Sequence, residues 1–196
     1  NNMELIFASH NAHKAEEIRQ LLPLTLKLYT LSDINYKDEI PETGSTLEEN
    51  ARIKAQTIFN KVKRPVFADD TGLEVEALGG APGVYSARFA GEEGNAVANM
   101  KKLLKEMEGI ENRKAQFRCC IVLIINNTEY VFNGIVRGTI ALSPKGNNGF
   151  GYDPVFIPEG DIHTFAELPL CVKNTISHRT LAIKQMVNFL SQITHA

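Results

Sequence analysis

A short apolar run that meets two adjacent carboxylates constrains this chain more than any other feature. Val66-Phe67-Ala68 is typical of a buried strand, and Asp69-Asp70-Thr71-Gly72 follows it directly. Burying an acid at a strand end costs free energy, and a second acid beside it makes each harder to ionise. A bound cation explains such a pair, but on these residues alone a surface turn that opens with Asp-Asp explains it equally well. Other motifs must decide between the two.

Strand-like and helix-like segments alternate along the chain in a pattern typical of an α/β protein. Short buried strands are predicted at residues 5–8 and 66–68, and a hairpin at residues 116–125 and 129–136. Helices are predicted at residues 15–22, 45–60, 95–106 and 180–193, the second opened by the capping box Ser45-Thr46-Leu47-Glu48 and the last by Ser177. The expected architecture is a mixed sheet with helices packed on it, in one domain covering residues 1–196.

Composition excludes several classes of partner. The 21 basic and 23 acidic side chains leave a formal charge of −2, so a general attraction to nucleic acid or anionic membrane is not expected. No signal sequence or apolar stretch of membrane-spanning length is evident. Cys119, Cys120 and Cys171 show no C-x-x-C spacing, and the adjacent pair is interpreted as core residues on opposite faces of a strand. A cytoplasmic protein is therefore expected.

One group of polar residues could hold an anion. Ser9, Asn11 and Lys14 lie where the first strand turns into a helix, and helix N-termini favour anions. His10 and His13 are interpreted as exposed residues of this turn rather than as metal ligands. An ordinary polar helix start explains the same residues, so the turn alone does not define a site.

A second group combines carboxylates with a lysine. Asn50 and Lys54 are four residues apart on one predicted helix and share a face, and Glu42 precedes that helix closely enough to turn toward it. With Asp69 and Asp70, Glu42 supplies the oxygen ligands that Mg²⁺ prefers, and a carboxylate beside such a site can deprotonate water. A solvated polar face remains the alternative for the helix.

Two further segments carry aromatic and basic residues. In Phe150-Gly151-Tyr152-Asp153, glycine lets the backbone approach a flat ligand on which an aromatic ring could stack, although an aromatic could equally anchor the loop to the core. Lys173 and Ser177-His178-Arg179, placed at the start of the last helix, offer donors for oxygens on a base or a phosphate.

These segments together resemble the inosine triphosphate pyrophosphatase family. The resemblance rests on Ser9-x-Asn11-x-x-Lys14, Glu42-Thr43-Gly44, the run from Ala68 to Leu73, the run from Gly79 to Arg88, the run from Gly149 to Pro154, and Ser177-His178-Arg179. The motifs follow in order over nearly the whole chain. The resemblance implies an elongated mixed β-sheet flanked by helices, in two lobes with the active-site cleft between them, and a homodimer.

The resemblance also implies an activity: hydrolysis of the non-canonical purine nucleoside triphosphates ITP, dITP and XTP to the monophosphate and pyrophosphate, with Mg²⁺. It makes Asp70 the general base and a metal ligand, with Glu42 and Asp69 holding or tuning the metal. Substrate binding is expected from Ser9, His10, Asn11, Ala12, His13, Lys14, Lys54, Thr71, Phe150, Gly151, Tyr152, Asp153, Lys173, His178 and Arg179. Lys173 and Arg179 are predicted to donate to the oxygen at purine position 6.

Two rival functions remain open at this point. One is a Maf-like pyrophosphatase acting on other nucleotides. The other is a nucleotide-binding module without turnover, against which stand three acids that would repel phosphate if no metal were present.

Overall fold

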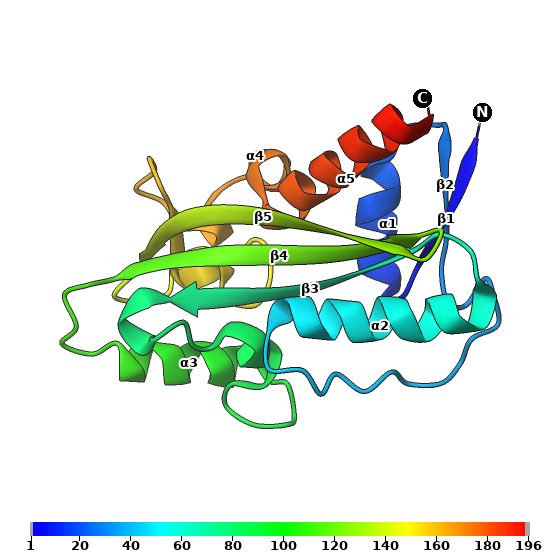
Figure 1. The fold of residues 1–196 in the computed structure, drawn as a ribbon. Coiled ribbons are helices and arrows are strands. Elements are labelled where there is room, and N and C mark those ends of the chain that lie inside the picture. Colours follow the sequence, from blue (N-terminus) through cyan, green and yellow to red (C-terminus); the bar gives the residue numbers. More distant parts are fainter. Residues whose placement is uncertain (1, 195–196) are drawn as a thin grey trace. The chain divides into compact units, whose positions relative to one another are not determined.

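The computed structural model describes residues 2–194 and has an α/β fold (Figure 1). Six strands form one sheet in the order β2-β1-β3-β4-β5-β6. The strands are β1 (Met3–Phe7), β2 (Leu26–Tyr29), β3 (Val66–Val75), β4 (Lys114–Ile125), β5 (Thr128–Ile140) and β6 (Phe156–Pro158). The helices are α1 (Ala12–Leu21), α2 (Leu47–Val62), α3 (Ala96–Glu106), α4 (Leu170–Ile176) and α5 (His178–Thr194). The predicted mixed sheet flanked by helices is confirmed.

The chain divides into two compact units, each formed by segments that are not contiguous in the sequence. Unit 1 holds the described residues up to Asp70, Cys119–Gly134 and the chain from Arg179 onward, and unit 2 holds Thr71–Arg118 and Ile135–His178. The prediction of one domain over the whole chain stays a prediction. No helix among residues 2–194 is both long enough and apolar enough to span a bilayer.

Unit 1 is built on parallel strands with helices on both faces. β1 pairs in parallel with β2 and β3, and Phe7 lies opposite Phe67 in the β1–β3 register. Phe67 and Cys119 belong to the buried cluster under α1 and α5, whereas Val66 and Ala68 belong to the cluster under α2. α1 and α5 lie on one face of the strands and α2 on the other (Figure 1). In the unit 1 part of β3, alternation therefore sends odd-numbered side chains toward α1 and α5 and even-numbered ones toward α2.

Unit 2 has an aromatic core and a serine that ties its segments together. Phe117, Phe156 and Phe165 pack with ring centroids 4.5 to 6.0 Å apart. The Ser86 hydroxyl donates to the Gly83 carbonyl at 2.6 Å and accepts the Leu73 amide at 2.9 Å. This serine lies in the short 3₁₀ helix Gly83–Arg88, which it fixes against β3.

Several predicted boundaries were wrong for local physical reasons. The strand predicted to end at residue 68 continues to Val75, so the two acids lie inside β3 and not at its end. The predicted capping box was wrong: Thr46 caps α2 by accepting the Glu49 backbone N–H, and the Glu49 carboxylate accepts the backbone N–H of Ser45. Three of these strands and helices were not predicted, the short strands β2 and β6 and the helix α4. Lys173 therefore belongs to α4 and not to the last helix.

The remaining elements agree with the sequence prediction. α3 begins after Asn95, whose side chain accepts from Ala98 N–H, and the β4–β5 turn contains Asn126 and Asn127 at positive φ. Ser177 immediately precedes α5.

Candidate active site

The turn from β1 into α1 is held by its own polar side chains. The Asn11 side chain caps α1 by accepting the Lys14 backbone N–H at 2.9 Å. The Asn11 backbone N–H donates to Ser9 Oγ at 3.1 Å. His10 contacts the Asp38 carbonyl at 2.9 Å and is exposed, as predicted for a turn residue. Ala12 and His13 are also exposed, within the first turn of α1. The capped helix start leaves this surface open to an anion.

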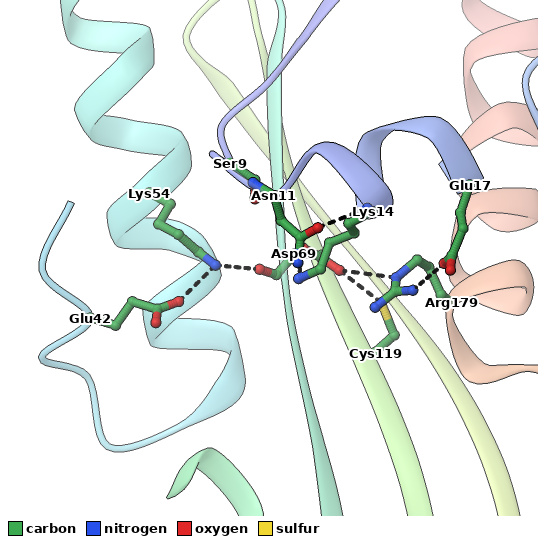
Figure 2. Close-up of polar contacts among 9 residues, drawn as sticks. All are labelled: Ser9, Asn11, Lys14, Glu17, Glu42, Lys54, Asp69, Cys119 and Arg179. Carbon is green, nitrogen blue, oxygen red and sulfur yellow. Dashed lines mark hydrogen bonds and ion pairs between the residues drawn. The ribbon is translucent and has the colours of Figure 1, made fainter. Parts of the chain in front are cut away.

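Asp69 is the centre of a buried charge network within unit 1 (Figure 2). Its carboxylate is 1% exposed, with Oδ1 3.2 Å from Lys14 Nζ and Oδ2 3.6 Å from Arg179 Nε. The Cys119 thiol lies 3.8 Å from the same Oδ2. Burial disfavours the charged form, but the two cations, with Lys54, hold the pKa of Asp69 well below its usual range. Asp69 is therefore a fixed negative charge.

Asp70 has the opposite electrostatic environment. Burial raises the pKa of Asp70 to about 6. The charges of Glu42 and Asp69 add to this rise. The charge of Lys54 and the neighbouring Asn50 side chain oppose it. Since Asp70 is an even-numbered residue of β3, its carboxylate faces the α2 side and can exchange a proton near neutral pH.

Glu42 and Lys54 meet on the α2 side, as their spacing predicts. Lys54 Nζ lies 2.7 Å from Glu42 Oε1 and donates to the Asp69 carbonyl at 2.6 Å (Figure 2). Asn50, one helical turn earlier, accepts the Gly44 amide at 2.7 Å. The loop that carries Glu42 is thus fastened to α2 from two positions.

The donor set was tested against the expected Mg²⁺. Among residues 2–194, no three His, Cys, Asp or Glu side chains converge closely enough to form a complete metal cluster. Magnesium needs only one or two protein carboxylates when phosphates and water complete its shell. Glu42 and Asp70 fit that requirement, because the charge of Glu42 acts on Asp70 strongly enough to raise its pKa, and a cation would relieve this repulsion between the two carboxylates. Asp69 fits it less well, because Lys14 and Arg179 already neutralise its carboxylate.

In unit 2, an exposed aromatic ring lies beside a buried ion pair. Phe150 is 65% exposed, and Lys173 Nζ lies 4.5 Å from its ring centroid. Lys173 also contacts Asp153 Oδ2 at 2.5 Å, and the same oxygen accepts the Phe150 amide at 3.0 Å. Asp153 thus shapes the loop and holds the lysine. The Lys173 ammonium therefore makes a cation–π contact with the face of the Phe150 ring.

Tyr152 and His178 are held within the same unit. The Tyr152 hydroxyl donates to the Ser86 carbonyl at 2.7 Å, and burial raises the pKa of this phenol. The His178 ring stacks on Phe117 at 5.0 Å. Tyr152 therefore anchors its loop to the unit, whereas Phe150 presents the accessible aromatic ring.

A separate cavity in unit 2 contains none of the predicted site residues. It has a volume of about 820 Å³ and charged residues from three strands in its lining, among them Glu74, Arg118 and Arg137. The Glu74 carboxylate oxygen Oε1 accepts hydrogen bonds from Gln116 Nε2 at 2.8 Å and from Arg118 Nε at 3.0 Å. Cavity size therefore does not locate the site; the polar clusters do.

Comparison with known proteins identifies the family. The sequence model of the Ham1 family matches residues 5–189. A Flavobacterium johnsoniae protein named dITP/XTP pyrophosphatase is 51% identical over 189 residues, which cover 96% of this chain and 98% of that protein. This chain belongs to the Ham1 family.

Solved structures of the Ham1 family have the same fold. The Staphylococcus aureus Ham1 protein is 41% identical, with a TM-score of 0.90 over 96% of this chain and 98% of the other. A Mycobacterium abscessus protein, named nucleoside-triphosphatase / dITP/XTP pyrophosphatase, is 39% identical, with a TM-score of 0.82 over 94% and 99% of the two chains. The resemblance stated from the sequence motifs is confirmed.

Within this Ham1-family fold, the predicted site residues fall into two groups. Unit 1 brings together Lys14, Glu42, Lys54, Asp69, Asp70 and Arg179, with Ser9 and Asn11 in the adjoining turn. Unit 2 brings together Phe150, Asp153 and Lys173, and its first residue is the half-buried Thr71. Gly151 lies in the Phe150 loop at φ +62°.

Sequence reasoning missed one charged member of the unit 1 group and one contact of a core cysteine. Glu17 Oε2 lies 2.6 Å from Arg179 NH1, although the two are far apart in sequence. Local spacing offered no signal for this pair, because Glu17 lies on α1 and Arg179 on α5. Cys119, correctly predicted to be a buried core residue, also contacts the Asp69 carboxylate.

Proposed function

We propose that this protein hydrolyses the non-canonical purine nucleoside triphosphates ITP, dITP and XTP to the nucleoside monophosphate and pyrophosphate. Relatives that match it over nearly its full length carry the name dITP/XTP pyrophosphatase. The observation that carries the proposal is the pair Asp69 and Asp70, whose pKa values move in opposite directions from adjacent positions. Carboxylates with separated pKa values are typical of acid–base sites.

The triphosphate is assigned to the cationic part of unit 1. Lys14 lies on the first turn of α1 beside the Asn11 cap, and Lys54 lies on α2 next to Glu42. Transfer of phosphoryl groups requires mainly positioning and neutralisation of developing charge. Lys14 and Lys54 supply that charge, with Ser9 and Asn11 as additional donors.

We assign Mg²⁺ to Glu42 and Asp70, with Asp69 as a supporting charge rather than a direct ligand. Bound there, Mg²⁺ supplies charge neutralisation for the phosphates. Asp70 orients the attacking water and accepts its proton, since its pKa of about 6 suits a general base. Cleavage of the anhydride between the α- and β-phosphates then releases pyrophosphate.

The purine is assigned to Phe150 and Lys173 in unit 2. Phe150 offers an exposed aromatic ring for stacking, and the Lys173 ammonium lies over the face of that ring. Hypoxanthine and xanthine present an acceptor at position 6, which a lysine can satisfy, whereas adenine presents a donor there and leaves the lysine unpaired. Arg179 was predicted to share this role. Its described partners, Asp69 and Glu17, support a role in unit 1.

Pyrophosphate release tests the proposal. The wild-type protein should release pyrophosphate from ITP, dITP and XTP only with Mg²⁺, and Asp70→Asn should lose at least about a hundredfold in kcat, as for loss of a general base. Asp38→Asn, at an exposed position, is the matched control. Turnover of thymidine or uridine triphosphate in preference to ITP would favour the Maf-like alternative. Tight ITP binding without metal-dependent release would favour the binding module.

We further propose a cytoplasmic homodimer. All three cysteines are free, and Cys171 is exposed, which suits a reducing compartment. The homodimer rests on the family resemblance. Sedimentation equilibrium should give twice the chain mass of 21.8 kDa, and a monomeric mass at micromolar concentration would overturn this assignment.

A further inference from the structure

His10 joins the turn after β1 to the loop that precedes α2, and both segments belong to unit 1. Its ring nitrogen Nε2 lies 2.9 Å from the Asp38 carbonyl oxygen, although the two residues are 28 positions apart. Because a carbonyl oxygen only accepts, Nε2 donates in this bond. The His10 ring also stacks on the Tyr36 ring, with centroids 6.3 Å apart and an interplanar angle of 21°. One side chain of the turn therefore contacts two residues of the loop.

Tyr36 is itself held in place, so it offers the His10 ring a fixed surface. Its backbone N–H donates to the Leu31 carbonyl at 2.9 Å. The residue packs against the buried cluster under α2, and Lys61 Nζ of that helix lies 5.2 Å from its ring centroid. The loop is thus attached to α2 at Tyr36, and His10 extends this attachment to the turn after β1.

The next part of the loop, residues 37–43, has few polar contacts. Within the part of the chain that the structure describes, it takes part in one hydrogen bond, at the Asp38 carbonyl, and one ion pair, at the Glu42 carboxylate. Pro41 fixes its own φ and restricts the residue before it, so the chain from Asp38 to Glu42 has little freedom once Asp38 is held. The bond from His10 therefore limits where the Glu42 carboxylate can lie.

The turn at the other end of this link carries the donors assigned to phosphate. His10 lies between Ser9 and Asn11, whose side chains already hold the start of α1. His10 is exposed, and neither of those two bonds involves it. Its described contacts all lead to the loop. A shift of the turn on anion binding would therefore reach Asp38 through this one side chain.

We propose that His10 is a positioning residue that couples phosphate binding at the turn to the placement of the Glu42 carboxylate. The inference rests on the proposed function, because it takes the turn as part of the triphosphate site and Glu42 as a metal ligand. The hydrogen bond to Asp38 is the link, and the contact with Tyr36 orients the imidazole. His10 acts through the loop and contacts neither metal nor substrate.

Amide hydrogen exchange with pyrophosphate, in the absence of metal, tests this coupling. In the wild type, pyrophosphate should slow exchange both at the start of α1 and in residues 37–43. In His10→Ala the start of α1 should still be protected, whereas the protection of residues 37–43 should be lost. His10→Gln keeps an N–H donor near the place of Nε2 and should restore the protection of the loop. His163→Ala, at an exposed histidine of unit 2 whose ring contacts Asp161, is the matched control and should behave as the wild type does.

The dependence of turnover on Mg²⁺ gives a second readout, one that a purely structural role would not change. His10→Ala should raise the half-saturating Mg²⁺ concentration at least about fivefold, as is typical for the loss of coupling between two sites. Its kcat at saturating Mg²⁺ should stay close to the wild-type value. His10→Gln should lie nearer to the wild type than His10→Ala does. A kcat that stays low at high Mg²⁺ would indicate a folding defect and contradict the positioning role.

The outcomes separate this inference from the proposed function. Unchanged loop protection in His10→Ala, or equal losses in His10→Gln and His10→Ala, would overturn the link through Asp38 and leave the proposed function intact. Loss of protection at the start of α1 in His10→Ala would show direct contact with phosphate and would overturn the positioning role alone. If pyrophosphate did not protect the start of α1 in the wild type, the triphosphate assignment and the inference would both be wrong.

Discussion

Adjacent aspartates in β3 have different roles because strand geometry sends their carboxylates to opposite faces. Asp69 faces α1 and α5, where Lys14 and Arg179 stabilise its charge. Asp70 faces α2, where Glu42 and burial destabilise its charge. A one-residue shift of this strand would exchange the two environments. The register of β3 therefore decides which acid is available to take a proton.

The raised pKa of Asp70 predicts a stability gain in Asp70→Asn. Its pKa is about 6 in the folded protein, against 3.8 for an ordinary aspartate carboxyl. Between these values the folded state binds more protons, so the free energy of unfolding falls as pH rises toward 6 and stays reduced above it. Metal-free Asp70→Asn should therefore be more stable than wild type at pH 7.5, by up to about 3 kcal/mol. Urea unfolding from pH 4 to pH 8 measures this.

The pH dependence and metal provide the controls for that prediction. The advantage of Asp70→Asn should shrink toward pH 4, where the wild-type carboxyl is protonated in the folded state. Added Mg²⁺ should stabilise the wild type more than the variant. Equal stability of the two proteins at pH 7.5 without metal would contradict the prediction.

Asp69 should respond in the opposite direction. Asp69→Asn leaves Lys14 and Arg179 without the charge that they neutralise, and removing one partner of a buried ion pair typically costs about 3 kcal/mol. Because the wild-type pKa is lowered, this loss should be largest at neutral pH and diminish as pH falls below the range of an unfolded aspartate. Asp38→Asn at the surface should change stability by less than about 0.5 kcal/mol.

At the scale of helices and strands, the sequence predicted which residues share a face of an element better than it predicted where the element ends. Helical spacing correctly placed Asn50 and Lys54 on one side of α2, with Glu42 nearby. The continuation of β3 was missed because acids and glycine are depleted in strands. What sustains it lies elsewhere in the chain: Leu73 N–H donates to Ser86 Oγ. Local propensity contains no information about such a distant partner.

Ser86 should therefore be important for the second half of β3. Ser86→Ala leaves the buried Leu73 amide without its acceptor and releases the Gly83 carbonyl, which should lower the free energy of unfolding by about 2 kcal/mol. Chemical denaturation measures this loss. Ser143→Ala, at an exposed position of the same unit, is the control and should be neutral. A neutral Ser86→Ala would show that β3 persists without this contact.

At the scale of the molecule, the order of motifs was sufficient to identify the family. It was not sufficient to show which charged side chains form ion pairs with one another. Glu17 and Arg179 form an ion pair from opposite ends of the chain, and nothing local in either segment indicates the other. Arg179 was consequently predicted to contact the base, whereas its described partners belong to the Asp69 network. Pairing of this kind depends on how α1 and α5 pack against the same strands, which emerges only from the folded chain.

The division into units predicts that different parts of the substrate protect different segments. Pyrophosphate with Mg²⁺ should slow amide hydrogen exchange in unit 1, at the start of α1 and in residues 42–54, because Lys14, Glu42 and Lys54 lie there. Inosine, which has no phosphate, should slow exchange in unit 2, in residues 149–153 and α4, because Phe150 and Lys173 lie there.

Adenosine is the matched control in this experiment, since its amino group at position 6 cannot accept from Lys173. It should give no protection at concentrations where inosine does. Protection of residues 149–153 by pyrophosphate, or of the start of α1 by inosine, would reverse the assignment of phosphate to unit 1 and base to unit 2. Lys173→Met should abolish the inosine effect and leave the pyrophosphate effect unchanged, because its ammonium contacts Asp153 and Phe150 within unit 2.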